Sequence, residues 1–409
     1  MDFELTRSEN DEQLLSQLAL LETAENIRVL IPFAKAYLGM FYVIDAELDA
    51  KEKVKLLANE KLANAVLKGF EASLLRTDIA SVEAIGHAMA EQKEIAEGYV
   101  ILAGLDLVAS KSNDAVAALN NDLIESAIGF HFSNKMNHRN SWFDYLLAEH
   151  KNKVVSGLLK YWLAMLKNNA TYLPGRDLVL GEKADAEIIK HTVLPLLQHW
   201  QKCKAKVVFQ LLQLAFKYAE AEALLKLSEG VLSDNKTINE KVRLYWVATA
   251  YLLSPDKYFA TLSNYVGRVK LKVMPLLDFV SSIVANEKEM NINISDKLIS
   301  QLLRMIAPIF PPQHHVYGAL GGLDINSRNV MLMFYFLARS KNKDVISEIK
   351  LLRKARVMKI YAAVIDNLVE LQVRKNNEKN FSFPDFEHYI ENLVNNNCLQ
   401  GRSNKFDLK

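Results

Sequence analysis

The chain has 409 residues, of which 50% are hydrophobic and 24% charged, and its formal net charge is +2. This is the composition of a soluble globular protein with enough apolar material for a large core, so neither disulfides nor a metal is required to hold it together. The two cysteines, Cys203 and Cys398, lie far apart and outside any C-x-x-C context, which indicates a reducing compartment.

The N-terminus and the apolar runs indicate neither secretion nor membrane insertion. The first residues, MDFELTRSENDEQLL, are acidic and polar, unlike the basic start and apolar run of a secretory signal. The most apolar run, Val330 to Ala338, is far shorter than the ~20 residues that span a bilayer. We therefore expect a cytoplasmic protein.

Charge is distributed unevenly along the chain. Residues 1–130 contain 11 Lys/Arg and 22 Asp/Glu, a net charge of −11, and the remainder carries +13. Such asymmetry fits an acidic half that packs against a basic partner, or a basic half that faces nucleic acid. Solvated helix faces that differ in charge are the favoured explanation, because the basic residues rarely cluster.

Helical periodicity dominates the whole chain. Glycine and proline are scarce, 15 and 9 residues, and few runs alternate with a period of two. We predict helical stretches over 11–48, 53–70, 78–90, 99–109, 114–130, 141–166, 185–200, 204–227, 242–253, 269–285, 295–307, 328–339, 345–373 and 384–395, and another that restarts at 254. Long loops are predicted over 168–183 and 308–326, where proline and glycine gather.

The stretch SWFDYLLAEHKNKVVSGLLKYWLAML, Ser141 to Leu166, predicts two helices that need partners. Ser141 and Asp144 fit the spacing of a helix-capping pair. Trp142 and Trp162 are predicted to be core anchors on the apolar faces of these helices.

Two later helices have informative patterns. The stretch Lys204 to Leu227 is apolar around most of its circumference, which predicts an inner helix between neighbours. The stretch 345–373 is predicted to bury one face that includes Leu351 and Met358, with Lys350 and Arg353 pointing away.

These patterns predict an all-α protein, either a HEAT-like α-solenoid or an irregular stack of helical hairpins. Units of roughly 35–45 residues suit HEAT-like pairs, although no repeating signature is present. We expect acidic N-terminal helical repeats over 1–120, a helical array over 121–396 and a disordered tail over 397–409.

No motif in the sequence specifies a nucleotide site or a hydrolase. The loop from Gly175 to Lys183 has the wrong spacing for a phosphate-binding loop, and no Ser/Thr follows to hold Mg²⁺. No G-x-S-x-G nucleophile elbow occurs.

Metal-binding patterns are also incomplete. His191 and His199 are eight residues apart without a carboxylate or thiolate to complete a zinc set, and His314 and His315 lie in a loop. The Pro-Asp pairs at 255–256 and 384–385 begin helices, which indicates capping instead of Mg²⁺ binding. We therefore predict no enzyme, no catalytic, cofactor-binding or metal-binding residue and no cofactor.

One basic cluster stands out near the C-terminus. It consists of Lys350, Arg353, Lys354, Arg356 and Lys359. These residues are the candidate binding surface, since basic clusters contact phosphates. No aromatic residues are interleaved for stacking on single strands, and a solvated helix face is the competing interpretation.

A family resemblance begins at AIGFHFSNKMNHRNSWFDYLLAEHKNKVVSGLLKYW. This run resembles a segment in the helical, HEAT-like region of bacterial NACHT-domain STAND NTPases. The likeness continues through VLPLLQHW, VRLYWVATAYLLSPDKYFATLSNYV, LLRMIAPIFPP and FSFPDFEHYIENLVNN, over roughly residues 125–396. The shared positions are packing positions.

The resemblance implies an antiviral or signalling switch in which a helical array binds a foreign molecule and an NTPase module then oligomerises. This chain has no recognisable NTPase motif or effector, so it would be the sensor and scaffold part alone, with a protein partner or a phage protein as its ligand. A nucleic-acid-binding scaffold that uses the basic C-terminal half is the alternative, as is an adaptor that bridges two proteins.

Overall fold

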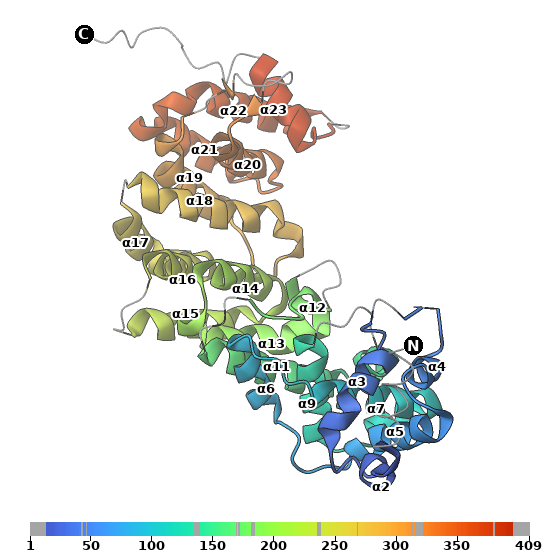
Figure 1. Cartoon of the computed structure of the whole chain (residues 1–409). Helices are drawn as coiled ribbons and strands as arrows, with labels where there is room; N and C mark the ends of the chain where they lie inside the picture. Colours follow the sequence, from blue (N-terminus) through green and yellow to red (C-terminus); the bar gives the residue numbers. More distant parts are fainter. Residues whose placement is uncertain are drawn as a thin grey trace, which may run out of the picture. The chain divides into compact units, whose positions relative to one another are not determined.

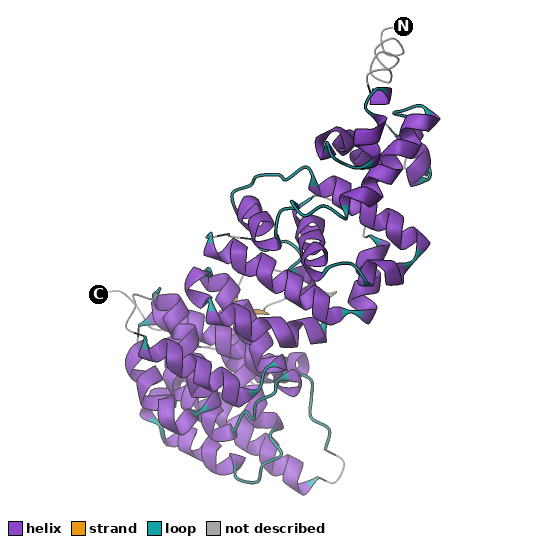
Figure 2. Cartoon of the chain, turned by 90° about the horizontal axis from the view of Figure 1, so that it is seen from below, coloured by secondary structure: helices purple, strands orange, loops and turns teal. Residues whose placement is uncertain are grey.

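The computed structural model describes residues 14–41, 44–45, 47–134, 140–168, 170, 172–180, 185–234, 239–267, 269–311, 314–315, 322–378 and 381–395. Within these residues the protein is all-α, as predicted, apart from one antiparallel pair of two-residue strands (Figures 1 and 2). In that pair β1 (His314–His315) aligns His314 with Leu323 of β2 (Gly322–Leu323). The predicted tail, 397–409, lies outside the described residues.

The chain forms two compact units, residues 1–204 and 205–409. The described helices of unit 1 are α2 (Leu18–Glu22), α3 (Ile27–Tyr37), α4 (Ala50–Lys55), α5 (Glu60–Ser73), α6 (Val82–Ala90), α7 (Gly98–Lys111), α8 (Asn113–Ala117), α9 (Asn121–Ser133), α10 (Ser141–Glu149), α11 (Lys151–Lys167), α12 (Asp177–Leu180), α13 (Ala186–Gln198) and the 3₁₀ helix η1 (Trp200–Lys202). The domain boundary predicted after residue 120 lies inside this unit, where α9 packs against α6 and α7.

Helix α11 is the centre of the packing in the second half of unit 1, where it contacts α6, α9, α10 and α13. The side chain of Trp162 on α11 is 1% exposed, and its indole Nε1 donates to the Pro174 carbonyl oxygen at 2.7 Å. Trp142 on α10 is fully buried. Both tryptophans are therefore core anchors, which confirms their predicted role.

Helices α6 and α11 approach closely because glycine faces the contact. A Cβ placed on Gly86 would lie 2.7 Å from the Tyr161 carbonyl oxygen and 2.9 Å from Ala164 Cβ. Both distances are below ordinary van der Waals contact, so a larger residue would push the two backbones apart. Glycine at this position is a packing requirement.

The start of α10 differs from the predicted cap. Its N-cap residue is Asn140, whose side chain makes no capping hydrogen bond. Ser141 is already the first helical residue, so its hydroxyl lies one position too far along the helix for the predicted capping geometry.

Unit 2 begins at α14. Its described elements are α14 (Ala205–Tyr218), α15 (Ala221–Ser233), α16 (Glu240–Leu253), α17 (Pro255–Val266), α18 (Lys270–Ala285), η2 (Glu287–Glu289), α19 (Asp296–Ile306), η3 (Ala307–Ile309), β1, β2, α20 (Ile325–Arg339), α21 (Val345–Lys354), η4 (Arg356–Tyr361), α22 (Ala362–Asn377) and α23 (Phe386–Asn395).

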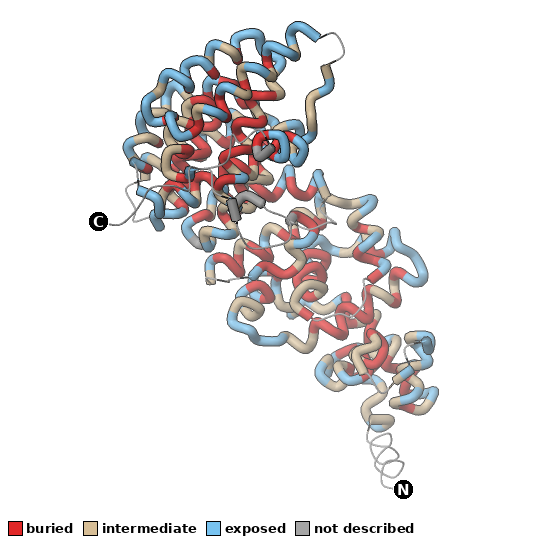
Figure 3. The backbone as a smooth tube through the Cα atoms, turned by 90° about the horizontal axis from the view of Figure 1, so that it is seen from above, coloured by how far each residue is buried: buried red, intermediate tan, exposed pale blue. Residues whose placement is uncertain are grey.

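The even-numbered helices of unit 2 form a continuous row. Helix α14 contacts α16, α16 contacts α18, α18 contacts α20 and α20 contacts α22, and the odd-numbered helices pack beside them (Figure 1). Helix α16 is buried on all sides, from Leu244 to Leu252, with Trp246 fully enclosed. Buried residues accordingly follow the inner faces of the helices (Figure 3).

The long inner helix predicted over 204–227 is two helices. Helix α14 ends at Tyr218, and Glu220 is extended before α15 begins. Asn291 stabilises the break, because its backbone N–H donates to the Phe216 carbonyl at 2.7 Å and its side-chain amide donates to the Ala219 carbonyl. These two oxygens would accept from the next helical turn if α14 continued.

Replacing Trp162 by alanine should lower the free energy of unfolding by about 3–5 kcal/mol, because it empties a large buried site and removes the bond to Pro174. Chemical denaturation of the whole chain measures this change. Lys167→Ala, on the exposed part of the same helix, should change the stability by less than about 0.5 kcal/mol. If the Trp162→Ala protein is as stable as the parent, Trp162 is not part of the core.

Two glycine-to-alanine substitutions should change the free energy of unfolding in opposite directions. Gly86→Ala should destabilise by about 1–3 kcal/mol through the clash with Tyr161 and Ala164. Gly230→Ala should stabilise by about 0.5–1 kcal/mol, since Gly230 lies inside α15 with nothing within 4 Å of its Cβ position. Thermal melting of the two variants checks both signs, and stabilisation by Gly86→Ala would contradict the close approach of α6 and α11.

Candidate functional site

The five basic residues singled out from the sequence lie on two consecutive elements of unit 2. Lys350, Arg353 and Lys354 are on α21, and Arg356 and Lys359 are on the 3₁₀ helix η4. All five side chains are exposed. We call the exposed side chains from 350 to 360 the α21–η4 surface.

The three-residue period of η4 sorts its six residues into three ridges, because side chains at i and i+3 align in a 3₁₀ helix. Met358 and Tyr361 form the inner ridge and are 1% and 0% exposed. Arg356 and Lys359 form an exposed basic ridge.

The third ridge of η4 is apolar and exposed. Val357 is 40% exposed and Ile360 is 51% exposed. A basic ridge and an apolar ridge therefore lie side by side on one short element, a combination that a purely solvated face does not require.

The inner ridge fixes the orientation of η4. The Tyr361 hydroxyl donates to the Phe310 carbonyl oxygen, and its ring lies 5.2 Å from that of Phe334. Burial of the hydroxyl raises the pKa of Tyr361 far above its usual value, so it remains a neutral donor. Contacts with η3, α21 and α22 complete the support.

Helix α21 buries a different face from the one predicted. Val345, Ile349 and Leu352 are buried, and α21 contacts α19. Leu351, predicted to be buried, is 47% exposed. The error arises because a single helix was assumed over 345–373, whereas Ala355 is extended and ends α21 before η4 and α22 begin.

Only one of the five cations makes an ion pair with another described residue. Arg353 Nε lies 2.7 Å from Asp366 Oδ1, and its Nη2 lies 3.2 Å from Oδ2. Hydrogen bonding to Asp366 and the Asp366 charge raise the pKa of Arg353. No hydrogen bond or ion pair with a described residue engages the side chains of Lys350, Lys354, Arg356 and Lys359. These four charges face solvent together.

The metal-binding patterns considered in the sequence do not converge. His191 Nε2 lies 3.7 Å from a Glu187 carboxylate on the same helix, and both side chains are exposed. Among the described residues no group of three or more His, Cys, Asp or Glu side chains is placed to hold a metal ion.

Both Pro-Asp pairs lie at helix starts, as predicted, although α23 begins at Phe386 and not at Pro384. Pro255 is the first residue of α17, with Ser254 at the N-cap position but without a side-chain capping bond. Asp385 Oδ1 accepts a hydrogen bond from the His388 backbone N–H at the start of α23, which confirms its capping role. In the Gly175–Lys183 loop, the described part contains the short helix α12, and residues 181–183 lie outside the described residues.

Comparison of the chain with protein-family models, curated proteins and solved structures returned no match. The resemblance to the NACHT-protein helical region therefore stays a prediction. Within the part of the chain that the structure describes, no helix is both long and apolar enough to cross a bilayer.

Sequence reasoning identified the basic half of the α21–η4 surface and missed its apolar half. Leu351, Val357 and Ile360 are apolar residues in a stretch that was interpreted as one α-helix. On such a helix, with its 3.6-residue period, they cannot be told apart from buried core residues. A three-residue spacing of Arg356 with Lys359 and of Met358 with Tyr361 is the signal that could have indicated η4.

The ridge assignment predicts a stability difference between neighbours in η4. Val357→Ser combined with Ile360→Ser should change the free energy of unfolding by less than about 1 kcal/mol, because both side chains are already exposed. Met358→Ala should cost about 2–5 kcal/mol. Urea denaturation of the two proteins measures both values, and a larger loss in the Val357/Ile360 variant would show that the ridges are misassigned.

Proposed function

We propose that this chain is a non-enzymatic helical recognition module that binds a protein partner through the α21–η4 surface. The observation that carries the proposal is the basic ridge of Arg356 and Lys359 beside the apolar ridge of Val357 and Ile360. Lys350, Lys354 and Leu351 extend the same mixed character onto α21.

The chemistry of this surface defines the partner. Unpaired cations attract an acidic surface and speed its approach. Three half-exposed aliphatic side chains then gain roughly 1 kcal/mol each when a partner covers them. The best complement is therefore an acidic protein segment that also presents aliphatic side chains.

The row of helices α14, α16, α18, α20 and α22 supports a HEAT-like arrangement of unit 2, because stacked helical pairs make contacts of this kind between alternate helices. Such an array suits the ligand-sensing part of a bacterial NACHT-type antiviral defence protein. In that role, partner capture relieves autoinhibition in an NTPase module, and a structural adaptor would use the same surface without that coupling.

A nucleic-acid-binding scaffold would use the same four cations, which pair with none of the described residues. The neighbouring exposed residues are aliphatic, however, and offer no aromatic face on which a base can stack. This contrast favours a protein partner and makes the two functions separable by mutation.

A labelled amphipathic peptide with one glutamate face and one leucine face is the probe for the proposed function, measured by fluorescence anisotropy on the whole chain. Val357→Ser with Ile360→Ser should weaken its binding about tenfold or more. Arg356→Glu with Lys359→Glu should also weaken it and reduce its salt dependence. Lys226→Glu with Lys270→Glu, the same charge change on exposed residues of α15 and α18, is the matched control.

A labelled DNA or RNA strand in the same assay tests the alternative. One result would contradict protein recognition as the role of this surface. In it, nucleic-acid binding depends on salt, is weaker in the Arg356/Lys359 variant and is unchanged in the Val357/Ile360 variant. ATP hydrolysis by the pure chain would contradict its non-enzymatic character.

A further inference from the structure

Unit 1 contains a cavity with a mixed polar and apolar lining, far in sequence from the α21–η4 surface. Its volume is about 770 Å³, within the ~300–1,000 Å³ typical of ligand sites. The cavity is bounded by the segment after α5, the start of α6, the α8–α9 connection and α11.

One carboxylate forms the buried floor of this cavity. The Glu125 side chain on α9 is only 10% exposed, and it accepts hydrogen bonds from Ser156 Oγ at 2.6 Å and from Lys160 Nζ. Glu125 also lines a smaller cavity of about 180 Å³ with Asn121, Asn152 and Lys153.

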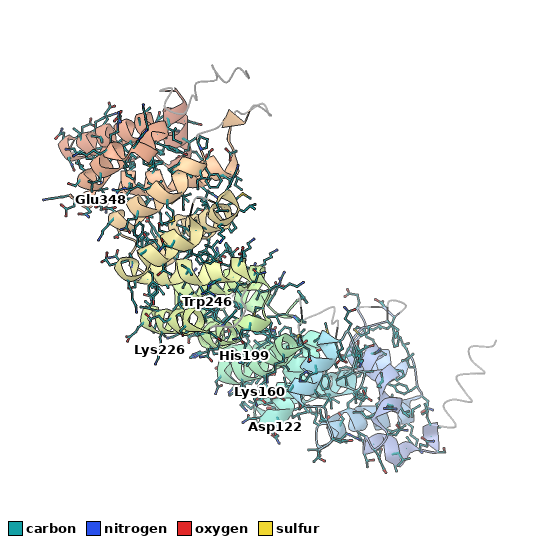
Figure 4. The ribbon with its side chains drawn as sticks, turned by 90° about the vertical axis from the view of Figure 1, so that its left-hand side faces the viewer. Asp122, Lys160, His199, Lys226, Trp246 and Glu348 are labelled. Carbon is teal, nitrogen blue, oxygen red and sulfur yellow. The ribbon has the colours of Figure 1, made fainter. Side chains whose placement is uncertain are left out.

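Two further carboxylates line the cavity. Glu83 on α6 and Asp122 on α9 are exposed, and no hydrogen bond or ion pair between their carboxylates and another described residue is formed. Asp122 and Lys160 come from different helices of unit 1 and are labelled in Figure 4. Hydrogen bonding to Glu125 raises the pKa of Lys160, and the charges of Glu125, Glu83 and Asp122 add to this effect. The field in the cavity therefore stabilises a cation.

The two basic side chains of the lining already form ion pairs within the protein. Lys160 pairs with Glu125, and Arg76 pairs with Asp78 and donates to the carbonyl oxygens of Ala24 and Glu25. An anionic ligand would have to displace these partners. A cationic ligand could pair with the carboxylates of Glu83 and Asp122, which have no partner among the described residues.

Exposed and partly exposed apolar side chains also line the cavity. Leu75 is 82% exposed, and Leu119 and Ile79 are partly exposed. Exposure of a leucine to this extent beside a charged cavity suits a ligand with both an aliphatic stem and a cationic head.

We infer that this cavity, which we call the Glu125 cavity, binds an arginine or lysine side chain of a protein partner. Its cationic head would lie between Glu83, Asp122 and Glu125, and its aliphatic stem would cover Leu75. The volume exceeds that of one side chain, so residues that flank the cation in the partner's chain enter as well. The acidic balance of residues 1–130 favours the approach of such a basic segment.

The test uses isothermal titration calorimetry of the whole chain with a capped peptide, Ala-Leu-Arg-Leu-Ala, and with the same peptide carrying citrulline in place of arginine. Citrulline keeps the shape of arginine and removes its charge. The arginine peptide should bind at least about tenfold more tightly. Equal binding of the two peptides, or no binding of the arginine peptide, would overturn the inference.

Variants of the lining residues test whether the peptide binds in the cavity. Glu83→Gln with Asp122→Asn should weaken arginine-peptide binding about tenfold, and Leu75→Ser should weaken it about threefold. Glu60→Gln with Glu149→Gln removes the same charge from exposed residues outside the cavity and should leave binding unchanged. Unchanged melting temperatures confirm that the variants fold, and equal effects of both double variants would overturn the site.

Free agmatine separates a peptide site from a site for small amines. Agmatine should bind more weakly than the arginine peptide because it lacks the flanking leucines, and equal affinity would overturn the assignment to a protein partner. The inference does not depend on the α21–η4 surface, since the acidic and basic peptides and their variants report on different units.

Discussion

Burial of apolar side chains between neighbouring helices is the interaction on which both units depend. Trp162 in unit 1 and Trp246 in unit 2 are enclosed by their neighbours, and α16 is buried on all sides from Leu244 to Leu252. Helices can bury such faces only where their backbones approach, which Gly86 permits between α6 and α11. The apolar pattern of the sequence therefore serves helix packing, and binding depends on the exposed residues that do not take part in that packing.

The α21–η4 surface illustrates this division. In η4 the inner ridge of Met358 and Tyr361 is committed to the core, and the three-residue period leaves the other two ridges outside. One of these is basic and the other apolar. The rigid support of Tyr361 by Phe310 and Phe334 means that a partner would meet a preformed surface, which reduces the entropy lost on binding.

Much of the fold could be predicted from the sequence, because helical periodicity and scarce glycine and proline depend only on local pattern. The all-α class and the burial of Trp142 and Trp162 followed directly. The break after Tyr218 could not be predicted, since it is stabilised by Asn291, 72 residues from the carbonyl of Ala219. Leu351 was misplaced because one helix was assumed over 345–373, whereas the extended residue Ala355 ends α21 before η4 begins. The Glu125 cavity was missed because its carboxylates come from helices that are adjacent only in the folded unit.

The most direct test of the central claim is to place a photo-activatable cross-linking residue at Val357 and illuminate the whole chain with the labelled acidic, leucine-bearing peptide. A contact between the apolar ridge and the peptide predicts a covalent adduct from position 357 and little from the same residue placed at Lys226 on α15. Equal labelling from both positions, or none from position 357 while the peptide is bound, would contradict recognition through the α21–η4 surface.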